Sequence, residues 1–186
     1  MSDANPVSTP CESNLHLQAS GSPLLNERDH QVRDYPQAVG SCMFLTVFTR
    51  GGCTFAVNQC ARFMSNPGPT HVAAIRRVLR HLAGTRSLGI TYRRSAGTEA
   101  NQLRATADAD HAGADGGRSV SGWAFFLVGV MVNWASKRQP ETTISTTESE
   151  FNDVLLCGLD CVYLHRMMAW LSTSNPESRC GNTHRA

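Results

Sequence analysis

Three stretches decide the fold: LRATADAD (103–110), VSGWAFFLVG (120–129) and VMVNWAS (130–136). The first alternates apolar residues with Thr and Asp, and a period of two is typical of a half-buried strand. The other two are rich in aromatic and β-branched residues, which favour strands. Only Val128 and Gly129 are available between them, so the hairpin turn is weakly specified. The sequence therefore predicts three consecutive strands.

A long helix is predicted directly after these strands. Ser145 and Glu148 match a capping box, in which the Ser begins the helix and the Glu side chain reaches back to the backbone. The apolar pattern continues to about Leu171. The residues expected to form its buried stripe are Phe151, Val154, Leu155, Leu159 and Val162.

Upstream, the apolar period changes to that of helices. Apolar residues recur at helical spacing over 39–47, 56–64 and 70–83, and SNPGP (65–69) ends the second of these helices. LGITYRR (88–94) is expected to be a strand.

The chain of 186 residues thus has an α+β fold class, with a small helical segment followed by a β-β-β-α unit. Residues 1–34 are poor in large apolar groups and are expected to form a flexible lead-in. Helices follow over 35–98 and the β-β-β-α unit over 99–171. Residues 172–186 are expected to be a flexible tail.

The balance of acidic and basic residues changes at the same boundary, between residues 98 and 99. Residues 35–98 contain eight Arg and no Asp or Glu, whereas 99–160 contain nine acids and four bases. Such a basic segment indicates a polyanionic partner, and a solvated basic surface is an equally good explanation. The candidate nucleic-acid-binding residues are Arg76, Arg77, Arg80, Arg93, Arg94, Lys137 and Arg138.

Other classes of protein find little support. The seven cysteines include no C-x-x-C pair, which argues against a disulfide framework or a zinc ribbon. The apolar stretch 122–135 is too short to cross a bilayer, and no secretory signal begins the chain. We therefore expect an intracellular protein with no membrane partner, in either the cytoplasm or the nucleus.

Two carboxylates are the candidate catalytic and metal-binding residues. A β-β-β-α unit can bring the first strand beneath the start of its helix, so that Asp108 and Glu150 would converge. Hard cations such as Mg²⁺ bind carboxylate oxygens and assist phosphodiester hydrolysis. Asp110 is a weaker candidate on the same strand. The alternative is structural, because Asp is common at strand ends and Glu is favoured in a first helical turn.

These motifs together resemble the Pol polyprotein of copia-type LTR retrotransposons. The resemblance runs through NPVSTPCESNLHL (5–17), AVGSCMFLTVFTR (38–50), FAVNQCARFMSNPGPTH (55–71), IRRVLRHLAGTRSLGITYRR (75–94), TADADHAG (106–113), RSVSGWAFFLVGVMVNWASKRQP (118–140) and STTESEF (145–151). It implies that the helical segment is a reverse transcriptase thumb and connection. The rest would be the N-terminal half of a ribonuclease H domain, which cleaves the RNA of RNA–DNA hybrids with two Mg²⁺ ions held by four carboxylates. Asp108 and Glu150 match two of those four.

The sequence also departs from the family. The third and fourth carboxylates have no counterpart, so the resemblance implies a truncated ribonuclease H-like unit with an incomplete site. A smaller apolar residue is usual where Asp153 stands. Three hypotheses remain: an inactive fragment that binds nucleic acid, an enzyme completed by the rest of a reverse transcriptase or by self-association, and a domesticated binding or interaction module.

Overall fold

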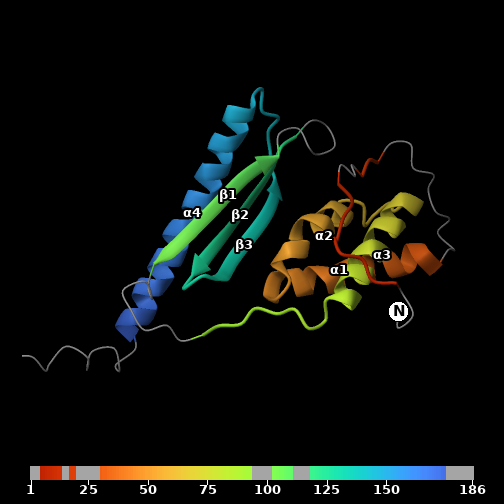
Figure 1. Ribbon diagram of the computed structural model, residues 1–186. Coiled ribbons are helices and arrows are strands. Elements are labelled where there is room, and N and C mark those ends of the chain that lie inside the picture. The colour runs from red at the N-terminus through yellow and green to blue at the C-terminus, as the bar shows by residue number, and fades with distance from the viewer. Residues whose placement is uncertain (1–4, 14–16, 20–29, 94–101, 111–117, 175–186) are drawn as a thin grey trace, which may run out of the picture.

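The computed structural model describes residues 5–13, 17–19, 30–93, 102–110 and 118–174, and the side chains of 30–33 and 173–174 are not included. The element order is α1 (His30–Phe48), η1 (Gly51–Cys53), α2 (Thr54–Ala61), α3 (Pro69–Gly84), β1 (Leu103–Asp110), β2 (Val120–Leu127), β3 (Val130–Arg138) and α4 (Thr146–Ser174). The helices α1–α3 form one group, and α4 lies along the sheet (Figure 1). The predicted α+β class is confirmed.

The three predicted strands form one antiparallel sheet in the order β1-β2-β3. The turn between β2 and β3 is Val128-Gly129, and both residues have positive φ, at 55° and 73°. Two left-handed residues match the right-handed twist of a tight hairpin. Glycine adopts this conformation without strain, whereas valine does not.

Two hydrophobic cores stabilise the chain. The larger lies among α1, α2 and α3, where Val39, Val57 and Val78 are fully buried. There the Tyr35 hydroxyl donates a 2.8 Å hydrogen bond to the Cys60 carbonyl. The smaller core lies between the sheet and α4, and its buried members are Trp123, Phe125 and Cys157.

The helices and the sheet meet at β3. The Trp134 indole donates to the Thr46 carbonyl at 2.7 Å, and the Asn58 amide donates to the Ser136 carbonyl at 2.8 Å. Gly51 lies so close to the Trp134 ring that a Cβ would stand 2.9 Å from its atoms. The Tyr92 hydroxyl adds a 3.3 Å bond to the Met131 carbonyl.

Several local expectations differ from the structure. Residues 88–93 form no strand, although β-prone residues occur there, because no neighbouring strand pairs with them among the described residues. Helix α1 begins at His30, within the expected lead-in, and Pro36 is one of its residues. Residues 5–12 contact α3 through side chains and backbone. The expected boundary at 98/99 and most of the tail lie outside the described residues.

The largest difference concerns the face by which α4 packs. All five residues of the expected buried stripe are exposed: Phe151, Val154, Leu155, Leu159 and Val162. The buried residues are Ser149, Asp153 and Cys157, with Leu156, Cys161 and Leu164 partly buried. The predicted stripe is therefore wrong. Hydrogen bonds from Gln139 to Ser121 and Ser149 attach the other face of α4 to the sheet.

Candidate functional site

Asp108 and Asp110 lie near the end of β1, a strand at the edge of the described sheet. In the register with β2, Asp108 faces Gly122 and Asp110 faces Val120. Both Asp residues are exposed. The end of β1 and the start of α4 lie at the same end of the β-β-β-α unit (Figure 1), and α4 packs on β1.

The predicted capping box fixes where α4 begins. The Glu148 backbone N–H donates to the Ser145 hydroxyl at 3.1 Å, as expected of an N-cap. The Glu148 carboxylate accepts a 2.8 Å bond from the Ile144 backbone N–H, one residue before the expected partner. Glu148 is thereby engaged in capping. Glu150, two residues later, is exposed in the first part of the helix.

A buried polar cluster attaches the start of α4 to the sheet. Gln139 follows β3, and its Nε2 donates to the Ser121 hydroxyl and the Ser149 carbonyl, both at 2.9 Å. Ser119 and Thr143 share a 2.8 Å hydrogen bond beside it. This cluster holds the connection between β3 and α4, and it therefore sets the position of Glu150. Gln139 was not identified from the sequence, where its only signal is its place in SKRQP (136–140).

Asp153 lies one turn after Glu150 and is 1% exposed. Its Oδ1 has no hydrogen-bond partner among the described residues. Burial raises the pKa of its carboxyl to about 6, a side-chain hydrogen bond with Ser121 opposes this shift, and the charge of Asp108 adds to it. The structure thus brings Asp108 close enough to Asp153 for their charges to repel. The sequence marked Asp153 as unusual without identifying it as a neighbour of the site.

Whether these residues can hold Mg²⁺ depends on how many of their oxygens converge. Carboxylate oxygens are suitable donors for this ion. Within the described ranges, however, no group of three or more His, Cys, Asp or Glu residues lies close enough to hold a metal ion. The donors therefore have the right chemistry, but too few of them converge.

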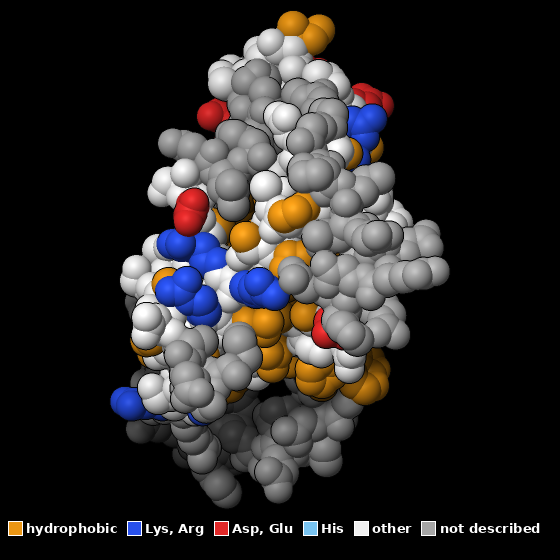
Figure 2. Space-filling model, turned by 90° about the vertical axis from the view of Figure 1, so that its right-hand side faces the viewer, with side chains coloured by type: hydrophobic (Ala, Val, Ile, Leu, Met, Phe, Trp, Pro, Cys, Tyr) orange, Lys and Arg blue, Asp and Glu red, His pale blue; other side chains and the backbone are white. Residues whose placement is uncertain are grey.

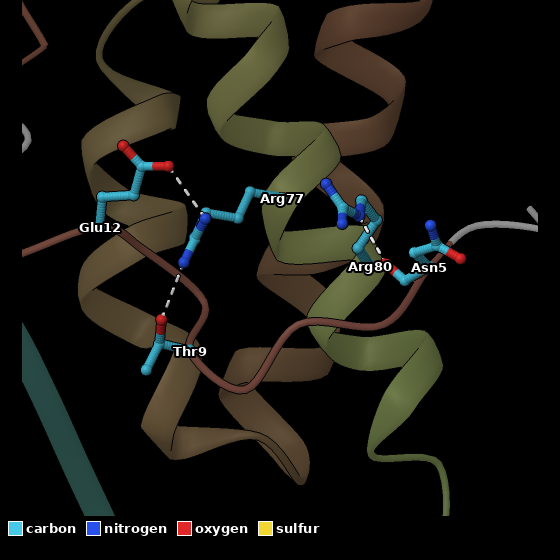
Figure 3. A network of polar contacts seen from close by, with 5 residues as sticks. All are labelled: Asn5, Thr9, Glu12, Arg77 and Arg80. Carbon is cyan, nitrogen blue, oxygen red and sulfur yellow. Dashed lines mark hydrogen bonds and ion pairs between the residues drawn. The ribbon is translucent and has the colours of Figure 1, made fainter.

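The predicted basic face of α3 is partly occupied by the chain itself. Arg77 forms a 2.9 Å ion pair with Glu12 and a 3.0 Å hydrogen bond with the Thr9 hydroxyl, and Arg80 donates to the Asn5 carbonyl at 2.6 Å (Figure 3). Arg76 is exposed. These contacts indicate that Arg77 and Arg80 fasten residues 5–12 to α3, a role the sequence did not reveal.

The remaining predicted cations lie in different places. Arg93 is exposed in the segment after α3, and Arg94 lies outside the described residues. Lys137 and Arg138 are exposed at the end of β3, where Lys137 stands 5.2 Å from the centre of the Trp123 ring. Together with Arg62, which follows α2, they line a groove between α2 and β3. Lys and Arg side chains also gather on the face in Figure 2, next to exposed apolar atoms.

Comparisons with known proteins identify relatives, although no family model and no solved structure matches the chain. It is 33% identical over 180 residues to the retrovirus-related Pol polyprotein from transposon TNT 1-94 of Nicotiana tabacum, covering 95% of this chain and 13% of that protein. It is 35% identical over 187 residues to the Pol polyprotein from transposon RE1 of Arabidopsis thaliana, covering 98% and 12%.

A shorter relative is the secreted RxLR effector protein 161 of Plasmopara viticola, which is 43% identical over 131 residues, or 70% of this chain and 90% of that protein. The chain thus spans about an eighth of the length of the two Pol polyproteins and most of this short one. The similarity to transposon Pol polyproteins extends over the helices, the sheet and α4 alike. The chain therefore belongs to the family of copia-type retrotransposon Pol polyproteins.

Proposed function

We propose that the chain corresponds to the connection and the first part of the ribonuclease H domain of a copia-type Pol polyprotein. In this role it binds an RNA–DNA hybrid and supplies two of the carboxylates that hold Mg²⁺ for cleavage of the RNA strand. The observation that carries the proposal is the placement of Asp108 on β1 and Glu150 on α4 at one end of the β-β-β-α unit. The basic groove between α2 and β3 supports the hybrid-binding part.

Among the described residues, too few carboxylates converge at this site for catalysis. Two-metal hydrolysis needs ligands on both ions to align the attacking water and the leaving oxygen. Asp108 and Glu150 are exposed, and no third donor converges with them among the described residues. Further carboxylates would have to come from residues of this chain outside the described ranges, from elsewhere in a Pol polyprotein or from another chain.

We expect no cleavage of a labelled RNA–DNA hybrid by the isolated chain in Mg²⁺ or in Mn²⁺, because the ligand set is incomplete. Wild type and Asp108→Asn should therefore behave alike. Cleavage by the wild type that is lost in Asp108→Asn would contradict this expectation and show that the site is completed in solution. Asp34→Asn is the control, because it removes an exposed carboxylate from α1, which carries no candidate site residue.

Hybrid binding should depend on the groove and not on the occupied part of α3. Arg138→Gln should weaken binding of an RNA–DNA hybrid about 3- to 10-fold at low salt and reduce the steepness of its salt dependence. Arg77→Gln removes the same charge but should leave affinity nearly unchanged, because Glu12 and Thr9 hold that guanidinium. Fluorescence anisotropy at several salt concentrations measures both. Equal losses in the two variants would show that only net charge matters.

A second candidate function is a binding or interaction module without catalysis. The observation that favours it is that the matching segment makes up 90% of a short relative, RxLR effector protein 161. A segment that stands almost alone in another protein need not depend on the rest of a polyprotein. Because the first candidate also predicts binding without cleavage by the isolated chain, the discriminating test adds the later part of a copia-type ribonuclease H domain. Cleavage of the hybrid by the mixture would support the first candidate, and binding that stays without cleavage would support this one.

A further inference from the structure

The outward face of α4 is apolar from Phe151 to Tyr163. The exposed large side chains there are Phe151, Val154, Leu155, Leu159, Val162 and Tyr163. Gly158 lies in the middle of this run, and a Cβ built on it would meet no atom within 4 Å. Water-soluble domains rarely leave so long an apolar surface uncovered. We call this surface the outer face of α4, and we expect a binding partner to cover it.

The spacing of the outer face fits a second helix. Leu155, Leu159, Val162 and Arg166 recur at intervals of four, three and four residues. Alternation of three and four is the seven-residue pattern by which two helices pack along a common seam. The buried side of α4, with Ser149, Asp153 and Cys157, is turned toward the sheet, so among the described residues the sheet does not cover the seam.

The charges on the outer face select the direction of that second helix. Glu148 and Arg166 are 18 residues apart, about five helical turns, and so lie on the same side of α4. In an antiparallel pair of identical helices whose midpoint is Cys157, Glu148 of one copy meets Arg166 of the other. The same register places Leu155 against Leu159. A parallel pair would place like charges together, which opposes association.

We propose that the outer face of α4 binds a second copy of this chain, in an antiparallel helix pair centred near Cys157. Each copy then covers the apolar residues of the other, and two Glu148–Arg166 pairs flank the seam. This inference does not rest on the proposed function, because it uses no residue of the candidate nuclease site or of the basic groove.

Oligomeric state tests the proposal directly. Sedimentation equilibrium of the full chain should give twice the mass of 20.2 kDa at micromolar concentrations. Leu159→Glu should weaken the dimer more than about 100-fold, because a charge would enter the apolar seam. Val47→Glu is the matched control, since Val47 is an equally exposed apolar residue on α1. A monomeric wild type, or dissociation by Val47→Glu rather than Leu159→Glu, would overturn the proposal.

Charge changes that keep the cap of α4 test the antiparallel register. Arg166→Glu should weaken the dimer about 10-fold, because two acids would then face each other. Adding Glu148→Gln to the same chain should restore part of the affinity, and the Gln side chain keeps an oxygen that can cap α4. A dimer whose affinity is unchanged by Arg166→Glu, or is not partly restored by Glu148→Gln, would overturn this arrangement. Circular dichroism confirms that each variant is folded.

A bilayer is the competing occupant. Thr146–Ser172 is long and apolar enough to cross a membrane by length and composition alone, and only 6% of its most apolar window is buried. Core helices of soluble proteins pass the same test, and α4 carries Glu148, Glu150, Asp153 and Asp160. Flotation of the wild type with phosphatidylcholine–phosphatidylglycerol vesicles, together with a monomeric state in their absence, would assign the face to lipid and reject the dimer.

Discussion

Replacing Phe125 with alanine should unfold the sheet and α4 while leaving α1–α3 folded. Phe125 is fully buried, and it shares the smaller core with only two other buried residues, Trp123 and Cys157. Removing a buried phenylalanine side chain costs about 3–5 kcal/mol, which is comparable with the total stability of many domains. The larger core contains none of these residues and should survive.

Hydrogen exchange followed by mass spectrometry distinguishes the two cores. In Phe125→Ala, peptides from 120–138 should lose protection, whereas those from 54–84 should keep it. Phe44→Ala is the control, because the Phe44 ring is 64% exposed and its loss should cost little. Loss of protection in both regions together would show that the chain unfolds as one cooperative unit.

Replacing Asp153 with alanine should stabilise the protein at neutral pH. The Asp153 carboxyl is buried with one oxygen unpartnered, and burial raises its pKa from 3.8 to about 6. The folded state therefore binds this proton more tightly than the unfolded state does. The free energy of unfolding should rise as the pH falls from about 6 to about 4, and the full cost of the buried charge is present above about 6.

Asp153→Ala should raise the free energy of unfolding at pH 7.5 by on the order of 1–3 kcal/mol and flatten its pH dependence between 4 and 6. Urea unfolding at a series of pH values measures both effects. Asp110→Asn should change neither, because Asp110 is exposed. A less stable Asp153→Ala at pH 7.5 would mean that this carboxylate has a favourable partner in solution.

The secondary structure was predictable wherever the local sequence pattern fits only one kind of element. Strict alternation defined β1, aromatic and β-branched runs defined β2 and β3, and Ser145 with Glu148 defined the start of α4. The packing face of α4 was not predictable. Apolar residues occur nearly all around this helix, so their period does not select a side. The buried polar cluster of Gln139, Ser121 and Ser149 selects it instead, and such long-range contacts leave no local signal.

The candidate site was predictable to the same degree. Placement of Asp108 and Glu150 at one end of the unit followed from the order of its elements. The proximity of Asp108 to Asp153 did not follow from that order, because it depends on how closely α4 packs against β1 and β2. The roles of Arg77 and Arg80 were likewise hidden. Their partners Glu12 and Asn5 lie more than sixty residues earlier in the chain.

The two edges of the sheet differ in a way that limits aggregation. On β3, the carbonyls of Ser136 and Met131 are taken by the side chains of Asn58 and Tyr92, whereas β1 pairs with no second strand among the described residues. Strands can add only where backbone groups are free. If two molecules paired through their β1 strands, the outer edges of the joined sheet would be the two β3 strands, whose carbonyls are partly occupied. Extension of the sheet would then stop at two molecules, whereas a sheet open at both edges can extend into a fibre.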